Sequence, residues 1–324
     1  MKKEQIAFVK QLLFSEEYQK TDLKTYAIVD SVREENATQQ VIFSALNSLN
    51  LWSEEIESET QTVQLHLVEL KKESELVTYL LEHHEKSVAT YFLSSHNLEE
   101  LGAYYSSFTL ADIEDEKEQF KKGIFGFYDP NILPNYIKTL YSHEKIAEFF
   151  AGITICFSPN PKKEDELTLM YPTGGTEVTV ETVTLKEPIE TTFLNSTTFT
   201  KETLEPYEGR RVIDHVQVGL FKRFAKEEFL ERLFIEYEKN ETWFKEFEEA
   251  SLQRASTLYD EAKELYDIES GAGLYRYILL GMKLLEPVKS YDLHDNLLNA
   301  SVEWERLEQL DKIIDYIKKE NVDV

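Results

Sequence analysis

Cysteine is almost absent from this sequence. Its 324 residues include only Cys156, so no internal disulfide can form and a reducing compartment suits the chain. Long apolar runs are also missing: the longest lies near residues 149–157, far short of the about 20 residues that a membrane span needs. No stretch of about 7–15 apolar residues follows Lys2 and Lys3, which argues against a secretory signal. We therefore expect a soluble, cytoplasmic protein.

Positively charged residues are far fewer than negatively charged ones. The chain carries 35 Lys and Arg against 61 Asp and Glu, a formal net charge of −26. Phosphate backbones and anionic membranes both attract clustered Lys and Arg, so nucleic acid and membrane surfaces are excluded as expected partners. The acidic excess includes residues 54–59, 112–118 and 227–249, and is therefore spread along the chain.

Apolar and aromatic residues are present in sufficient number for a folded protein. They make up 42% and 12% of the sequence, which is enough to fill a core and argues against global disorder. The chain is also longer than the roughly 250–300 residues at which single cores stop growing. We therefore expect more than one domain.

Residues 1–160 alternate between strand-like and helix-like patterns. Short apolar runs predict strands at 26–30, 64–70, 87–93 and 124–128, and amphipathic spacing predicts helices at 3–20, 36–51, 74–84 and 97–107. Asn97 is a candidate N-cap, and Asp129-Pro130 is expected to open another helix. Such alternation is typical of an α/β domain with a mainly parallel sheet, which is the fold class predicted here.

The sequence pattern changes twice in the rest of the chain. Residues 161–198 begin as a polar, Pro-containing linker and continue as a β-hairpin extension, with strands at 167–171 and 176–183 separated by a Gly-Gly turn. Residues 199–324 show only helical spacing, which predicts an all-α helical bundle as a C-terminal lobe.

Motifs for catalysis or for a cofactor are mostly lacking. His83 and His84 are adjacent and so face different sides of a helix, and His143 has no second histidine at a metal-binding spacing. The glycines near 123–126 and 271–273 match neither phosphate-binding nor dinucleotide-binding loops. Cys156 lies in an apolar run typical of an inert buried thiol. We therefore expect no metal and no cofactor.

Two carboxylates could mark a site. Asp30 ends the first predicted strand and Asp129 ends the fourth, and ligand sites gather at the carboxyl ends of parallel strands. The competing interpretation is that both side chains cap the backbone segments that follow them. We favour capping, because it explains Asp-Pro without a further function.

Two segments of the sequence resemble a known family. They are 125–133, Phe-Gly-Phe-Tyr-Asp-Pro-Asn-Ile-Leu, and 26–30, Tyr-Ala-Ile-Val-Asp. Together they resemble the effector adaptor, or chaperone, family of bacterial type VI secretion systems, catalogued as a domain of unknown function. Residues 93–101 are similar in style, and residues 266–285 are similar to the family's helical C-terminal lobe. The motif residues are Tyr26, Asp30, Phe127, Tyr128, Asp129 and Pro130, with a structural or partner-binding role.

The resemblance implies a non-enzymatic protein with protein partners. Such adaptors bind a secreted effector in the producing cell's cytoplasm and help to load it onto the VgrG-type spike protein. A partner segment could dock as a helix in a groove or pair with the hairpin strand at 176–183. Aromatic residues that could anchor it are Trp52, Trp243, Tyr104 and Tyr105, although core packing is the favoured role for any single one of them.

Two alternatives from other functional classes remain open. One is an acidic immunity-type inhibitor that covers a basic toxin by charge complementarity. The other is a hydrolase that uses Asp30 and Asp129 at the sheet edge, with or without a metal ion.

Overall fold

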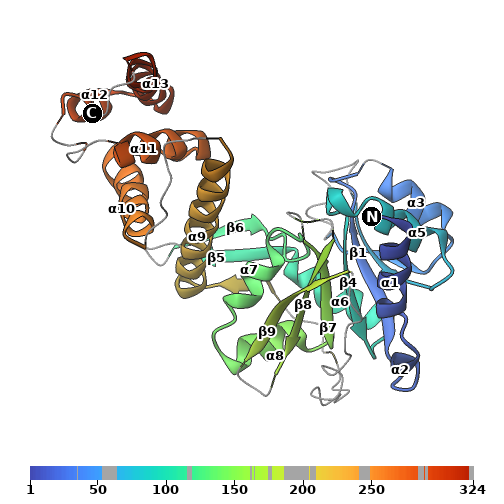
Figure 1. Ribbon diagram of the computed structural model, residues 1–324. Helices are drawn as coiled ribbons and strands as arrows, with labels where there is room; N and C mark the ends of the chain where they lie inside the picture. Colours follow the sequence, from blue (N-terminus) through green and yellow to red (C-terminus); the bar gives the residue numbers. More distant parts are fainter. Residues whose placement is uncertain are drawn as a thin grey trace. The chain divides into compact units, whose positions relative to one another are not determined.

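The computed structural model describes residues 1–34, 36–52, 64–114, 119–160, 163, 165–173, 177–185, 204, 209–240, 249–283, 288 and 291–320. The chain divides into two compact units, Met1–Phe221 and Lys222–Val324. The first unit contains the sheets, and the second is helical (Figure 1). Helix α9 (His215–Asn240) begins in the first unit and ends in the second.

The first unit is built around a seven-stranded sheet of described residues, in which every neighbouring pair is antiparallel. In spatial order its strands are β2 (Ser48–Asn50), β3 (Leu65–Glu69), β1 (Lys24–Asp30), β4 (Ala89–Ser94), β7 (Ile155–Pro159), β8 (Glu166–Pro172) and β9 (Val178–Thr184). A smaller sheet contains β10 (Arg211–Ile213), β5 (Leu110–Glu114) and β6 (Phe120–Ile124), with β5 parallel to β10 and antiparallel to β6.

The prediction of a mainly parallel sheet is therefore wrong. Helix α5 (Glu75–Glu82) does connect two strands that run in the same direction, β3 and β4, but β1 lies between them and runs the opposite way. The sequence pattern reveals the crossover helix and cannot reveal the inserted strand. Because β1 is covered on both faces, it also has the continuous apolar run that is typical of parallel strands.

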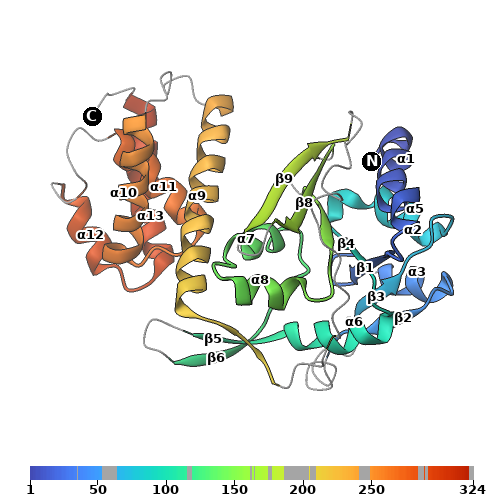
Figure 2. The same cartoon turned by 90° about the horizontal axis from the view of Figure 1, so that it is seen from below.

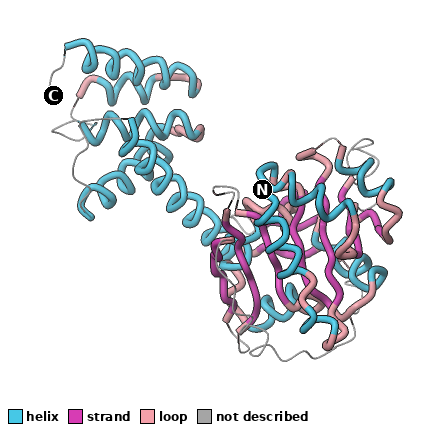
Figure 3. The backbone as a smooth tube through the Cα atoms, turned by 45° about the vertical axis from the view of Figure 1, so that its right-hand side comes forward, coloured by secondary structure: helices cyan, strands magenta, loops and turns pink. Residues whose placement is uncertain are grey.

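Helices cover both faces of the large sheet. Alternate residues of each central strand point to opposite sides, so Tyr26 and Ile28 belong to one core while Ala27 and Val29 belong to the other. The second face packs against α1 (Lys3–Leu13), α3 (Ala37–Phe43) and α5, as Figure 2 shows. The first face packs against α6 (Leu98–Tyr105), α7 (Leu133–Lys138) and α8 (His143–Phe150). The backbone trace in Figure 3 shows the strands running together between these helices.

Capping explains several of the element boundaries. The side chain of Asn97 accepts the N–H of Glu100 at 2.8 Å, and the carboxylate of Glu100 accepts the N–H of Asn97 at 3.0 Å. This reciprocal pair starts α6 where the sequence predicts a helix. Ser74 caps α5 by accepting the N–H of Leu76 at 3.2 Å.

Two local predictions differ from the structure. The helix expected over 36–51 ends at Phe43, because the chain turns at Ala45 with φ 52° and continues as β2. The strand expected at 124–128 lies earlier, as β6, and the following aromatic residues form a turn. Helix α7 then begins at Leu133 with a proline in its first turn, Pro134, while Pro130 lies buried in the preceding turn.

The hairpin strands β8 and β9 pair as expected, and they form one edge of the large sheet. The helical prediction for the C-terminal region is also confirmed from His215 onward. In the second unit, α10 (Glu249–Tyr266), α11 (Gly271–Lys283), α12 (Leu293–Asn299) and α13 (Glu303–Glu320) enclose a separate apolar core.

A buried histidine is expected to make the first unit sensitive to acid. His84 lies in the 3₁₀ turn His84–Lys86, and neither of its ring nitrogens has a hydrogen-bond partner among the described residues. Burial lowers its pKa from 6.5 to about 4, with a smaller contribution from the N-terminal amino group. Between these two values the unfolded chain binds more protons than the folded one, so stability is complete above pH 6.5 and declines as the pH falls toward 4.

We expect His84→Leu to weaken this pH dependence, because leucine has a similar volume and no proton to bind. The slope removed is at most about 1.4 kcal/mol per pH unit, which corresponds to one proton. Urea unfolding of both proteins between pH 7 and pH 4 measures the slope. Equal slopes for the variant and the unmodified protein would contradict the assignment.

Candidate functional site

An open pocket of about 760 Å³ lies where β1 ends. Its lining combines charged, aromatic and apolar side chains from four separate segments of the first unit: Asp30, Val32, Arg33, Trp52, Glu85, Lys86, Ile124, Tyr128 and Asp129. Three of them, Asp30, Tyr128 and Asp129, belong to the motif residues singled out in the sequence. We take this pocket as the candidate functional site.

Asp30 lies at the inner wall of this pocket. It is the last residue of β1, and its backbone N–H donates to the carbonyl of Val88 at 2.9 Å. Its side chain is buried, with 8% of the residue exposed, and Oδ1 accepts the N–H of Val32 at 2.9 Å. This bond fixes the turn by which the chain leaves the sheet.

Asp129 occupies an equivalent position in the turn that follows β6. Its Oδ1 accepts both the backbone N–H and the side-chain amide of Asn131 at 2.9 Å, and its own N–H donates to the carbonyl of Gly126 at 2.9 Å. The carbonyl of Tyr128 accepts the hydroxyl of Thr90 at 2.6 Å, which fastens the turn to β4. Both aspartates therefore cap the N–H two residues onward, and the capping interpretation is confirmed.

Both cations of the pocket have carboxylate partners. The guanidinium of Arg33 forms an ion pair with Asp129, and the ammonium of Lys86 forms one with Glu34. The Lys86 interaction also holds the pKa of the Glu34 carboxyl below its usual range. Asp30, by contrast, forms no ion pair within the described part of the chain.

Several groups around Asp30 shift the pKa of its carboxyl in opposite directions. Burial raises the pKa of its carboxyl, the N–H of Val32 and the charge of Arg33 lower it, and the charge of Asp129 raises it again. The pKa of Tyr128 is raised by burial and then by the charges of Asp30 and Asp129, so its hydroxyl stays protonated at neutral pH. The pocket thus presents a poorly compensated carboxylate beside an aromatic ring and a neutral phenol.

The carboxylates of the pocket differ in how far they are occupied. Both oxygens of Asp129 already have partners, Arg33 and Asn131, whereas Asp30 and Glu85 form no ion pair among the described residues. Among the described residues, no group of three or more His, Cys, Asp or Glu side chains is arranged to hold a metal ion.

The other motif residues lie in the core. Tyr26 is fully buried, donates its hydroxyl to the carbonyl of His96 at 2.7 Å, and stacks on Phe92 with ring centroids 5.6 Å apart. Phe127 points into an aromatic cluster away from solvent, and Pro130 is buried. These three residues therefore support the site rather than line it.

The aromatic anchors considered in the sequence take different positions. Trp52 lines the pocket, although it is buried. Tyr104 and Tyr105 are core residues whose hydroxyls donate at 2.6 Å to the carbonyls of Glu148 and Phe149, and they hold α8 against α6. Trp243 lies outside the described residues.

Sequence reasoning missed Val32, Arg33, Glu85, Lys86 and Ile124. A parallel sheet would place residues that precede a strand at the edge opposite to Asp30. Because β4 is antiparallel to β1, the charged residues just before β4 lie beside the end of β1 instead. The signal available in the sequence was that charged residues stand next to the strand ends. Only the direction of the strands decides which of these residues lie side by side.

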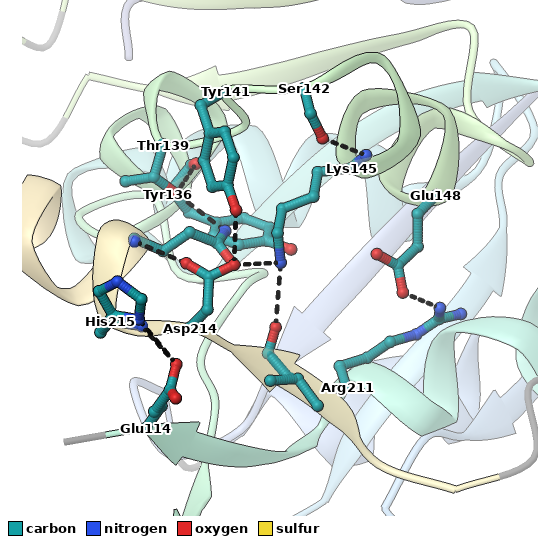
Figure 4. A network of polar contacts seen from close by, with 12 residues as sticks. Glu114, Tyr136, Thr139, Tyr141, Ser142, Lys145, Glu148, Arg211, Asp214 and His215 are labelled. Carbon is teal, nitrogen blue, oxygen red and sulfur yellow. Dashed lines mark hydrogen bonds and ion pairs between the residues drawn. The ribbon is translucent and has the colours of Figure 1, made fainter. Parts of the chain in front are cut away.

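A second group of polar residues fixes the start of α9 on the first unit (Figure 4). Asp214 precedes the helix: its Oδ1 accepts the N–H of Gln217 at 3.0 Å, and its Oδ2 contacts the hydroxyl of Tyr141 at 2.9 Å and the ammonium of Lys145 at 3.0 Å. Burial raises the pKa of Asp214, but these hydrogen bonds outweigh burial and hold the pKa below its usual value.

Two further pairs complete this group. The carboxylate of Glu114 accepts the backbone N–H of His215 at 2.9 Å and lies 3.1 Å from its Nδ1, as Figure 4 shows. Arg211 forms an ion pair with Glu148 and is itself buried. Together these contacts attach β10 and the first turn of α9 to β5 and α8, which is a structural role.

The comparisons with known proteins concern the part of the chain that contains the pocket. Residues 25–146 match one family model. Its description is "Domain of unknown function (DUF4123)". The matched residues run from β1 into α8 and include every motif residue named above. No curated protein and no solved structure matches the chain.

Two further properties bear on the kind of protein. Within the described residues, no helix has the length and apolar character that crossing a membrane requires. Cys156 is buried in β7, and burial raises the pKa of its thiol, so it stays protonated and unreactive.

Proposed function

We propose that this protein is an adaptor of a bacterial type VI secretion system, which binds a cognate effector in the cytoplasm and helps to load it onto a VgrG-type spike protein without catalysis. The observation that carries the proposal is the match of residues 25–146 to a domain-family model, DUF4123. The Phe-Tyr-Asp-Pro signature and the residues around Asp30 fall within that match.

The pocket supports a role in recognition. It is open, it combines aromatic walls with charge, and the exposed side chains of Val32 and Ile124 border it. Interfaces commonly join a few such apolar contacts to a polar rim. The edge strand β9 is a second surface that a partner strand could extend, because its outer side has no neighbour in the described sheet.

The experiment that tests the proposal is affinity capture of the tagged full-length chain from the cytoplasm of its native cell. We expect one effector and a spike protein among the captured proteins, and loss of effector secretion when the gene is deleted. Normal secretion of every effector in the deletion strain would overturn the proposal. Inhibition of a captured toxin would indicate an immunity protein, and turnover abolished by Asp129→Asn in a folded variant would indicate a hydrolase.

We expect association with the partner to depend on salt. A net charge of −26 steers a basic partner toward the protein, and this attraction is screened over about 10 Å at 0.1 M salt. Association rates should fall roughly tenfold or more between low and high ionic strength, while dissociation rates change less. Equal association rates in stopped-flow measurements at the two salt concentrations would remove charge steering from the proposal.

A further inference from the structure

The pocket at the end of β1 contains a carboxylate, that of Asp30, which forms no ion pair among the described residues. Arg33 and Lys86, the pocket's two cations, have Asp129 and Glu34 as partners. Asp30 accepts one backbone N–H through Oδ1, and its Oδ2 has no hydrogen-bond partner among the described residues. That oxygen is not among the fully buried unpartnered atoms, so it keeps some exposed area, and Asp30 lines the pocket.

The surroundings of Asp30 suit a long side chain with a charged end. Trp52 and Tyr128 contribute aromatic side chains to the lining, and aromatic rings attract cations. Val32 and Ile124 are 63% and 54% exposed and could cover the apolar part of a ligand. Glu85 adds a carboxylate to those of Asp30 and Asp129. A lysine or arginine side chain has this combination of an aliphatic stem and a positive end.

We propose that this pocket binds an arginine or lysine side chain of the partner protein, with its cationic group on Oδ2 of Asp30 and its aliphatic stem against Trp52 and Tyr128. This inference rests on the proposed adaptor function and names the chemistry by which the partner is recognised. An anionic ligand fits less well, because both cations of the pocket already have carboxylate partners.

The probes are three N-acetylated tripeptide amides that differ only in the central residue: arginine, its uncharged isostere citrulline, or glutamate. Binding to the full-length protein is followed by nuclear magnetic resonance at the amide of Val32, which donates to Asp30. We expect saturable shifts with the arginine peptide, and at least about tenfold weaker binding with citrulline, because the charge pair is lost. Equal affinity for arginine and citrulline, or tighter binding of glutamate, would overturn the proposal.

Variants locate the effect. Asp30→Asn retains an oxygen that can accept the Val32 N–H, so the turn is preserved while the charge is removed; we expect at least about tenfold weaker binding of the arginine peptide. Val32→Lys alters an exposed side chain and places a like charge at the mouth, with the same expected direction. The control Glu99→Gln removes one charge from the exposed surface of α6 and is expected to change affinity less than about twofold. Unchanged affinity in Asp30→Asn would overturn the assignment.

The same variants separate this inference from the proposed function. If the unmodified protein captures an effector and Asp30→Asn captures it with equal affinity, the adaptor function stands and the pocket assignment is wrong. If no effector is captured or secreted through this protein while the arginine peptide still binds at Asp30, the adaptor function is wrong and the cation site stands.

Discussion

Replacing Phe127 by alanine is expected to lower the free energy of unfolding of the first unit by about 3–5 kcal/mol. Only 1% of the residue is exposed, and its ring lies 5.5 Å from that of Phe108, 6.0 Å from that of Tyr105 and 6.4 Å from that of Phe149, measured between centroids. Alanine would remove these contacts and leave a cavity in the centre of the aromatic core. Urea unfolding monitored by circular dichroism measures the loss.

The matched control is Phe43→Ala. Phe43 ends α3 in the same unit and is 77% exposed, so its truncation should alter stability by no more than about 0.5 kcal/mol. Equal effects of the two substitutions would mean that Phe127 is not a core residue. If Phe127→Ala lowers stability much more than Phe43→Ala, the phenylalanine of the Phe-Tyr-Asp-Pro signature stabilises the fold, while its aspartate shapes the pocket.

Replacing Arg211 by alanine is expected to destabilise the first unit by about 2–4 kcal/mol. The buried guanidinium forms an ion pair with Glu148, and its central carbon lies 4.2 Å from the ring centroid of Phe108 and 4.9 Å from that of Tyr104. Alanine would leave Glu148 without this cation and remove the packing on both rings. Because Arg211 begins β10, the attachment of the following helix α9 should loosen too.

Hydrogen exchange separates these effects from a general loss of stability. In Arg211→Ala, amides of β10 and the first turn of α9 should exchange faster than those of β1. The neighbouring substitution Arg210→Ala serves as the control, because Arg210 pairs with Asp112 at 3.6 Å in a partly exposed position, where the contribution is about 1 kcal/mol or less. Similar destabilisation by both substitutions would contradict the role given to Arg211.

Local features of the fold were predictable where short-range interactions decide them. The pairing of β8 with β9 follows from alternation on either side of a Gly-Gly sequence, and the start of α6 follows from a capping residue and a glutamate three positions later. The aromatic turn before α7 was not predictable in this way. Phe125, Phe127 and Tyr128 suggest a strand, but all three are buried by the tertiary core and the backbone between them turns.

The sequence by itself determined an apolar strand that ends at Asp30, a helical C-terminal region, and an acidic excess that disfavours nucleic acid. Only the tertiary structure decided strand direction, since a strand buried on both faces has the same apolar run in either orientation. That direction brings Glu85 and Lys86 beside Asp30, in a pocket lined by four separate segments.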